Sequence, residues 1–460
     1  MQLSNTHRHG RVGRFAPGSA CLPAAAPQHA RRGRAARQLG SLQTLLLSRL
    51  LGGLLAGLLT LAGTPALADD GLRLSGFGTL GYAYDRYGDI APARDISQKP
   101  RDGPSTGPGW RLDSRLGVQL EYRLGAGIDL VGQFVARDHF EADLDSATEL
   151  AYAAFKPLPQ LDIRAGRINY DAFLMSDHRN VGYAYPWVRP PAEFYGWIPI
   201  FSVDGADLAY TVNGDDARWR IKLQAGRARV DIPIGEGYEF KAERLRGLSL
   251  SRETASWRLK AAYSQFTIGS EVPAFAPLHQ GLHAVAAAAI PDVSAEAAEL
   301  HRELSFERAR VSYATLGAAY DDGTWLAQAE IGRTTATADV VPHGKMAYAS
   351  VGRRFGNWTP YLLYGISRPD NDRRRAANDW GGLNAALRDP ALFVVNATRI
   401  EQETFSVGTR WDFHRQAALK LQWDHTRIKP SGYGLWWRDL AINERSRHVS
   451  LISATLDFTF

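Results

Sequence analysis

The sequence has almost none of the residues that could build disulfides or cysteine-based metal sites. Its 460 residues include a single cysteine, Cys21, which lies near the N-terminus. One thiol cannot form an internal disulfide, and the chain shows neither a cysteine cluster nor a calcium loop of the EF-hand type. We therefore expect no metal and no cofactor, and we expect stability to come from hydrogen bonds between strands.

Long apolar runs are also scarce, which argues against a membrane protein built of helices. A transmembrane helix needs roughly 18 or more apolar residues in a row. One segment, residues 45–68, comes close, and it lies at the front of the chain behind a basic stretch that has no acidic residue. It ends in an A-x-A pattern, Ala66 to Ala68, as secretory signals do. We predict a signal peptide over residues 1–68, cleaved after Ala68, whose long basic part suggests a start placed too far upstream.

Removing this segment changes the charge of the chain. The whole sequence has 54 Lys and Arg against 48 Asp and Glu, a net charge of +6. Without the eight arginines of residues 1–68, 46 basic residues face 48 acidic ones, a net charge of −2. The basic character therefore belongs to the predicted signal peptide, and we expect no nucleic-acid partner.

The remaining residues alternate between apolar and polar. From Ile452 to Phe460 every even position is apolar and every odd position is polar, while Leu451 breaks the pattern just before. Residues 110–124 alternate in the same way and carry aromatic residues towards both ends of the apolar face. A period of two gives a strand one apolar and one polar face. Aromatic residues at both ends of the apolar face are typical of strands that cross a membrane.

The pattern predicts an all-β fold, a transmembrane antiparallel β-barrel over residues 69–460. An even number of strands, about sixteen, would bring both termini to the periplasmic side. Short connectors largely alternate with long ones near residues 86–109, 170–202, 268–305, 368–400 and 428–446, and an Ala-rich part of 268–305 could form a short helix. The predicted strands begin near Leu72, Trp110, Ile128, Thr148, Leu161, Val203, Ala217, Glu243, Ser256, Phe306, Thr324, Gly344, Thr359, Gln402, Gln416 and Arg447.

Two short motifs suggest chemistry that their context does not support. Residues 76–81 match the dinucleotide fingerprint G-x-G-x-x-G, but strand-like residues follow where a helix would have to begin. Ser176, Asp177 and His178 are consecutive, whereas the members of a catalytic triad meet from separate segments. We therefore read the first motif as small residues of a strand, and we expect no catalytic set from the second.

The segment 170–202 differs most from an ordinary loop. It is rich in aromatic residues and proline, yet it also carries charged residues. A flexible exposed loop would be more polar. We therefore expect this segment to pack against another part of the protein.

These features resemble the bacterial outer-membrane porin superfamily, which includes general-diffusion and phosphate-selective members. The terminal strand ending in Phe460 and the long loop after the fifth predicted strand carry the resemblance. It implies that residues 170–202 fold into the barrel as a constriction loop whose acidic side chains face basic residues of the wall. The implied residues are Asp171, Asp177 and Glu193 on the loop and Arg111, Arg115, Arg123, Arg164, Arg218, Arg220 and Lys222 on the wall.

The resemblance implies a passive channel for small hydrophilic solutes and ions, not an enzyme. It further implies the Gram-negative outer membrane with its lipid, a homotrimer, and recognition of the strand ending in Phe460 by the barrel-assembly machinery. Arg and Lys outnumber Asp and Glu on the polar faces of the clearest strands, which favours a weak preference for anions.

Four alternatives remain open. A solute-specific channel would need a ladder of like side chains along the bore. An outer-membrane enzyme would need a catalytic set, and an energised receptor would need a plug and about 22 strands, more than about 390 residues can hold. A soluble secreted β-protein is disfavoured by the Trp and Tyr residues at the ends of the apolar faces.

Overall fold

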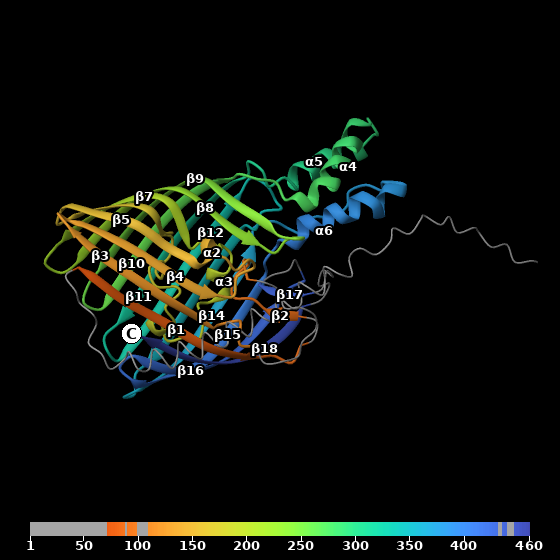
Figure 1. Cartoon of the computed structure of the whole chain (residues 1–460). Helices are drawn as coiled ribbons and strands as arrows, with labels where there is room; N and C mark the ends of the chain where they lie inside the picture. The colour runs from red at the N-terminus through yellow and green to blue at the C-terminus, as the bar shows by residue number, and fades with distance from the viewer. Residues whose placement is uncertain (1–70, 88–89, 99–108, 431–434, 439–445) are drawn as a thin grey trace, which may run out of the picture. The chain divides into compact units, whose positions relative to one another are not determined.

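The barrel predicted from the alternating pattern is present. The computed structural model describes residues 71–87, 90–98, 109–430, 435–438 and 446–460, and the predicted signal peptide and cleavage site lie outside them. Within the described residues, sixteen antiparallel strands form a closed barrel in which β1 pairs with β18 (Figure 1). The structure thus confirms the all-β class, the antiparallel barrel and the strand count.

The barrel strands are long, most of them with ten to thirteen residues. They are β1 (Leu72–Tyr84), β3 (Arg115–Gly125), β4 (Ile128–Arg137), β5 (Thr148–Leu158), β6 (Leu161–Asn169), β7 (Ser202–Asn213), β8 (Arg218–Ile232), β9 (Tyr238–Glu253), β10 (Trp257–Ile268), β11 (Arg310–Asp321), β12 (Trp325–Ala336), β13 (Gly344–Arg353), β14 (Trp358–Pro369), β15 (Gln402–His414), β16 (Ala417–Ile428) and β18 (Arg447–Thr459).

The other elements lie in the connections between barrel strands. Strands β2 (Ile90–Pro92) and β17 (Trp436–Arg438) pair with each other outside the barrel sheet. The α-helices are α2 (Leu144–Ala147), α3 (Ala192–Tyr195), α4 (Ala276–Ala287), α5 (Val293–Glu303) and α6 (Asp389–Ala397). Short turns of other helix types are η1 (Gly182–Ala184), η2 (Pro273–Phe275), η3 (Gly381–Leu383) and η4 (Asn384–Arg388). No helix in the described part of the chain is both long and apolar enough to cross a membrane.

The two ends of the barrel have different connections. At one end, which we call the turn end, neighbouring strands are joined by two to four residues, as between β3 and β4 or between β15 and β16. At the other end, the loop end, longer segments join the strands, and α4, α5 and α6 gather there (Figure 1). β1 begins and β18 finishes at the turn end. Short and long connections thus alternate as predicted.

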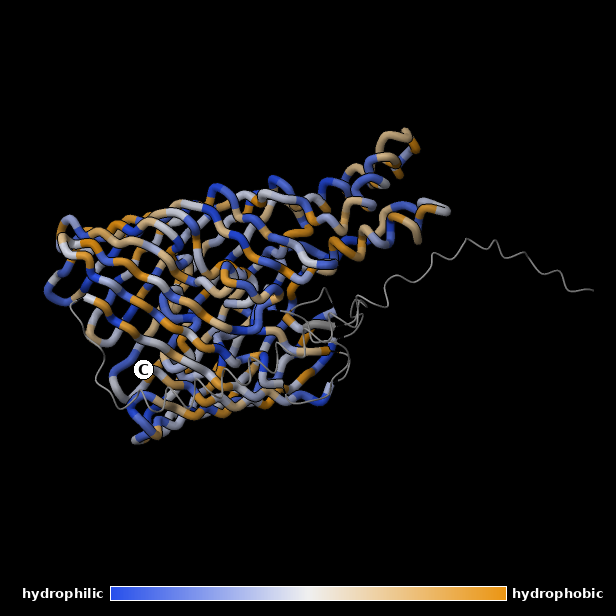
Figure 2. The backbone as a smooth tube through the Cα atoms, viewed as in Figure 1, coloured by the Kyte–Doolittle hydropathy of each residue, from blue (hydrophilic) through white to orange (hydrophobic). Residues whose placement is uncertain are grey.

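The outer face of the barrel is apolar. Along the strands, hydrophilic and hydrophobic residues alternate (Figure 2), and the exposed large side chains are mainly Leu, Ile, Val and aromatic residues. Near the turn end, five exposed tryptophans mark one edge of this face, namely Trp219, Trp257, Trp325, Trp358 and Trp411. An apolar band edged by aromatic residues is the arrangement found in membrane-spanning barrels.

The C-terminal strand closes the barrel through two aromatic rings laid over glycines. Gly78 pairs with Phe458, and a Cβ atom on Gly78 would come within 2.2 Å of that ring. Gly76 exchanges backbone hydrogen bonds of 2.9 and 3.0 Å with Phe460, whose ring covers it in the same way. Aromatic rings over strand glycines fill the space that these residues leave open. The G-x-G-x-x-G match is therefore part of a strand, as predicted.

Three predicted strand starts were off by four or five residues, and local geometry explains each one. Residues 110–113 form a turn ahead of β3, so this strand starts at Arg115 instead of Trp110. β9 starts at Tyr238, before the predicted Glu243, because the chain has a positive φ of 55° at Arg244 and the buried positions change from even to odd numbers there. A bulge of this kind breaks the period of two. β11 starts at Arg310 instead of Phe306 because Arg308 has φ of 65°.

Candidate functional site

The segment between β6 and β7, residues 170–201, lies inside the barrel; we call it the inner loop. Its base is closed by a hydrogen bond of 2.9 Å from the Tyr170 N–H to the Phe201 carbonyl. Most of its aromatic residues are buried together with Tyr313 and Tyr348 of the wall. Their rings pack in edge-to-face or tilted orientations at centroid distances of 5.1 to 6.1 Å. This apolar packing explains why the loop is so rich in aromatic residues.

Polar contacts fix the loop to the wall on the side of β12 to β16. The Trp187 indole donates to Ser350 of β13 at 2.8 Å, and the Val188 N–H donates to Gln422 of β16 at 3.0 Å. The Leu174 N–H donates to Glu330 of β12 at 2.9 Å. Because buried backbone N–H groups need partners, these wall side chains hold the loop in one position.

Asp171 ties the beginning of the loop to β8, β9 and β10. Its carboxylate lies 3.1 Å from the Lys222 ammonium, accepts a hydrogen bond of 2.6 Å from Ser249, and is also paired with Lys260. Burial on its own would raise the pKa of Asp171, but the two lysines and the hydrogen bonds outweigh it and hold the pKa well below its usual range. Asp171 is therefore an anionic anchor between two cations.

Arg189 joins the far side of the loop to three other segments. Its guanidinium donates to Asp113 at 2.6 and 2.9 Å, to Asp424 of β16 at 2.8 Å and to Ser453 of β18 at 2.6 Å. Burial lowers the pKa of Arg189, but the two carboxylates more than compensate and raise it above its usual value. This planar group bonds Asp113 through two nitrogens and Asp424 through a third, a bidentate geometry that a lysine ammonium does not provide.

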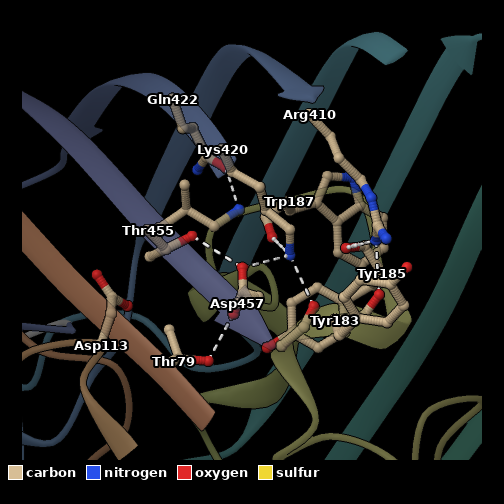
Figure 3. A network of polar contacts seen from close by, with 12 residues as sticks. Thr79, Asp113, Tyr183, Tyr185, Trp187, Arg410, Lys420, Gln422, Thr455 and Asp457 are labelled. Carbon is tan, nitrogen blue, oxygen red and sulfur yellow. Dashed lines mark hydrogen bonds and ion pairs between the residues drawn. The ribbon is translucent and has the colours of Figure 1, made fainter. Parts of the chain in front are cut away.

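A second buried cation lies at the middle of the loop (Figure 3). The Lys420 ammonium donates to the carbonyls of Gly182 at 2.6 Å and Trp187 at 2.8 Å, and lies 3.1 Å from Asp457. Asp457 also accepts hydrogen bonds from Thr79 and Thr455. A Cβ atom at position 182 would lie 2.0 Å from the Asp457 carboxylate, so this close approach requires glycine.

Two arginines of the wall hold the turn that contains η1. Arg115 of β3 donates to the Asn180 carbonyl and the Tyr185 hydroxyl, both at 2.6 Å. Arg410 of β15 donates to the Tyr183 carbonyl at 2.6 Å and to Asp412 at 2.7 Å. Both guanidiniums therefore point inward and contact the loop directly.

The structure brings some of the sequence-predicted site residues together and separates others. Asp171 meets Lys222, and Arg115 touches the loop. Asp177 accepts a hydrogen bond of 2.6 Å from Asn169, whereas Glu193 accepts bonds from Gln402 and Thr404. Burial raises the pKa of Glu193, although these hydrogen bonds oppose the rise.

The remaining predicted wall residues make contacts away from the loop. Arg164 of β6 pairs with Asp207 of the neighbouring β7, and Arg220 of β8 pairs with Asp162 of β6 across the intervening β7. Arg111 lies at the loop end and pairs with Asp138, while Arg123 and Arg218 are exposed at the turn end. These five arginines therefore do not share one cluster with Arg115 and Lys222.

The inner loop leaves water-sized spaces on several sides. A cavity of about 520 Å³ lies below it at the turn end, and its lining includes the ion pairs of Arg354 with Asp321 and of Arg410 with Asp412. Smaller cavities of about 90, 50 and 30 Å³ border the loop higher up. The described barrel is therefore filled by the loop over part of its cross-section and hollow elsewhere.

The consecutive residues Ser176, Asp177 and His178 make separate contacts in the inner loop. Ser176 accepts a bond from the Phe173 N–H and Asp177 bonds to Asn169, so these neighbours of His178 have other partners. The sequence reasoning overlooked a His-x-x-x-His pair on α4, His279 and His283, whose rings pack against His301 of α5. In the part of the chain that the structure describes, no three His, Cys, Asp or Glu residues are placed to hold a metal ion.

Among the comparisons with known proteins, only those with solved structures find a similarity. No family model and no curated protein matches the sequence. The fold is similar to an anion-selective porin from Comamonas acidovorans, with 11% identity and a TM-score of 0.47, over 85% of this chain and 99% of that chain. It is also similar to the outer-membrane channel DcaP of Acinetobacter baumannii (11%, TM-score 0.47, 86% and 100%). A third similar structure is OmpF of Salmonella typhi, with 12% identity and a TM-score of 0.46, over 85% of this chain and 97% of that chain.

The strongest loop contacts were not predicted from the sequence. Arg189 is one of the charged residues of segment 170–202, but nothing in its sequence neighbourhood reveals Asp113 and Asp424, which are 76 and 235 residues away. Lys420 could be assigned to the polar face of its strand from the alternation. Its depth in the barrel depends on strand register, which the alternation does not give.

Proposed function

We propose that this chain is a porin of the Gram-negative outer membrane, through which small hydrophilic solutes diffuse passively. The observation that carries the proposal is a closed barrel with an apolar outer band and a charged loop anchored inside. A closed barrel satisfies all backbone groups between strands, which a lipid environment requires. The inner polar faces and the cavity at the turn end suit an aqueous path. The proposal includes no enzymatic step.

A weak preference for anions belongs to the same proposal. Basic side chains such as Arg115, Lys222 and Lys420 surround the inner loop, but nearby carboxylates compensate most of them. The cavity at the turn end is lined by both signs, with Arg258, Arg354 and Arg410 against Glu253, Asp321 and Asp412. Facing charges of opposite sign select weakly, so we expect a small anion preference.

One observation favours a second candidate, a solute-specific channel. The inner loop is bonded to β12, β13, β16 and β18 on one side and to β8, β9 and β10 on the other. Such a loop leaves a narrower passage than one attached to a single side of the wall. A narrow passage discriminates between solutes by size and charge.

Conductance of the refolded mature chain in a planar bilayer tests the proposal. We expect stepwise openings with current proportional to voltage, and a reversal potential in a salt gradient that indicates slightly more anion than cation flux. A folded barrel that shows no conductance at any voltage would contradict the porin function. Conductance blocked by one class of solute at low concentration would favour the solute-specific channel.

The export route completes the proposal. We propose that residues 1–68 are removed after Ala68, that the barrel-assembly machinery recognises the strand ending in Phe460, and that three copies of the chain assemble in the outer membrane. The resemblance to the porin superfamily supports these steps. Mass spectrometry of the protein from outer membranes would give the cleavage site, and cross-linking followed by gel electrophoresis would give the number of copies.

A further inference from the structure

Three of the cavities beside the inner loop form a row from the loop end to the turn end. The cavity of about 90 Å³ at the loop end and the one of about 30 Å³ in the middle share Glu149 and Phe201 in their linings. The middle cavity and the large one at the turn end share His178. The two upper cavities lie against the wall of β4 to β6, whereas the large one is lined by the inner loop and by residues from β9 to β15, so the row crosses the barrel beneath the loop.

An aromatic ring that lies between two cations separates the cavity at the loop end from the middle cavity. The Arg137 guanidinium lies 3.6 Å from the centre of the Phe201 ring, and the Arg179 guanidinium lies 3.4 Å from it. Arg137 lines the cavity at the loop end, and Arg179 lines the middle cavity. Phe201 thus stands between the two spaces, and cation–π attraction holds its ring in place.

The groups around this ring have unused hydrogen-bonding capacity. Arg137 and Arg179 are more than nine-tenths buried, yet one terminal nitrogen of each has no hydrogen-bond partner in the described structure. Nearby, Asp95 and Glu149 lie 3.7 and 3.2 Å from Arg137, and Arg94 pairs with Asp95. Three arginines thus face two carboxylates. At the ring itself, unpaired buried N–H donors beside this local excess of cations favour an anionic occupant. The loop-end cavity beyond the ring has the opposite balance, with six carboxylates against three arginines in its lining.

We propose that solutes cross the barrel along this row of cavities and that Phe201, held between Arg137 and Arg179, is the gate of the path. The inference rests on the porin function proposed above and specifies its route and the class of solute. A small anion, such as a carboxylate, a phosphate or chloride, takes up the unused arginine donors while the ring swings aside. The anion preference thus arises mainly at this gate.

Removing the ring tests the gate. The narrowest section of a pore dominates its resistance, so Phe201→Ala should raise the single-channel conductance at least about twofold. Phe240→Ala is the matched control, because Phe240 is a buried phenylalanine of β9 that packs against Phe266, outside the row of cavities. An unchanged conductance in Phe201→Ala, or an equal rise in both variants, would overturn the gate.

Cysteine labelling tests the route, because the mature chain has no thiol of its own. Gln133 lines the middle cavity, whereas Ser406 lines the cavity of about 50 Å³ on the opposite side of the loop. An anionic thiosulfonate reagent should block most of the current of Gln133→Cys and leave that of Ser406→Cys unchanged. It should act on Gln133→Cys faster than a cationic reagent of similar size. Mass spectrometry reports whether each thiol has reacted.

The outcomes separate this inference from the porin function. If neither cysteine variant nor the parent protein conducts, the porin function itself is wrong. If the channels conduct but Gln133→Cys is not modified, or is modified without loss of current, the route is wrong. Block at Ser406→Cys would place the path on the other side of the loop. The two cysteine substitutions can also be combined with Phe201→Ala. If the reagent then blocks the current only in the variant with Gln133→Cys, the gate has opened. If it blocks the current with either cysteine, the whole loop has loosened.

Discussion

Arg189 shows how much a single side chain contributes to holding the inner loop. It occupies a site between Asp113 and Asp424 from which water is largely excluded. Desolvation of three charged groups is costly, so the arrangement is stable as long as the charges remain matched. A buried cation of this kind fixes the position of the loop more strictly than apolar packing does.

We therefore predict that Arg189→Met strongly destabilises the protein. The substitution leaves two carboxylates buried without a counter-charge, which typically costs about 3–5 kcal/mol. Urea unfolding followed by tryptophan fluorescence would measure the loss. Arg123→Met is the control, because Arg123 is 75% exposed and lies 3.7 Å from Asp129; we expect a change below about 1 kcal/mol. Recovery of stability when Asp113→Asn and Asp424→Asn are added would confirm the charge imbalance, and an unchanged loss would contradict it.

The contribution of Glu193 to stability should change with pH in the opposite direction to that of a carboxylate in an ordinary ion pair. Burial raises its pKa above the usual 4.5, so the folded protein favours the protonated carboxyl. Its contribution to stability is complete below pH 4.5 and decreases as the pH rises through the folded-state pKa. We expect Glu193→Gln to raise the melting temperature relative to the parent at pH 8 and to change it little at pH 4. A difference that is the same at both pH values would show that Glu193 is not held in its neutral form.

At the scale of elements, a row of glycines allows three strands to approach each other closely. Gly166 of β6 pairs with Gly205 of β7, which pairs with Gly226 of β8. A Cβ atom at Gly205 would lie 2.1 Å from the Ala225 carbonyl oxygen. The inner loop connects two of these strands, and glycine kinks are a common way to bend the wall of a barrel.

We predict that Gly205→Ala lowers the free energy of unfolding by about 1–3 kcal/mol, as overpacking usually does, because the obstructing atoms belong to the backbone. Gly132→Ala in β4 is the matched control, since the nearest atom to its Cβ would be a Phe134 side-chain atom at 3.9 Å. Unfolding midpoints of the two refolded variants would measure both changes. Equal midpoints would mean that the close approach of β7 and β8 is not required.

The elements also show what the sequence could predict. The period of two located all sixteen strands because each strand has an apolar outer face and a more polar inner face. It failed at Arg244, where a bulge changes the parity of buried positions. Leu451, which breaks the pattern in the last strand, belongs to a small buried cluster with Leu112, Ile428 and Trp436. Local periodicity thus records the environment of each face, and exceptions mark places where the loops fold back.

The inner loop was harder to predict for a physical reason. Its aromatic composition indicated that it packs against something, but its partners come from strands throughout the chain. Trp187 meets Ser350, and Arg189 meets Asp424, more than 160 residues away in both cases. Which wall residues reach the loop depends on the tilt and stagger of the strands. A single sequence does not contain that information, so predicted residues such as Arg123 and Arg218 lie far from the loop.

At the scale of the whole molecule, the alternation of faces makes a prediction about lipid. Leu223 of β8 is 55% exposed, lies two outward positions beyond Trp219, and pairs with Leu208 and Leu248 of the neighbouring strands. If this face contacts lipid, Leu223→Arg should lower the free energy of unfolding from lipid bilayers by about 2–4 kcal/mol, the cost of an arginine near the centre of the membrane.

The control introduces an arginine on the inner face of the barrel instead. Gln119 of β3 is half-buried, faces the interior and hydrogen-bonds to Glu121 and Gln133. Gln119→Arg puts the new charge beside a carboxylate and water, so we expect a change below about 1 kcal/mol. Urea titration in vesicles of defined lipid, followed by tryptophan fluorescence, compares the two variants. Equal losses of unfolding free energy in both variants would mean that this face is covered by protein instead of lipid. The same conclusion would follow if Leu223→Arg lost as much unfolding free energy in detergent with a high water content as in vesicles.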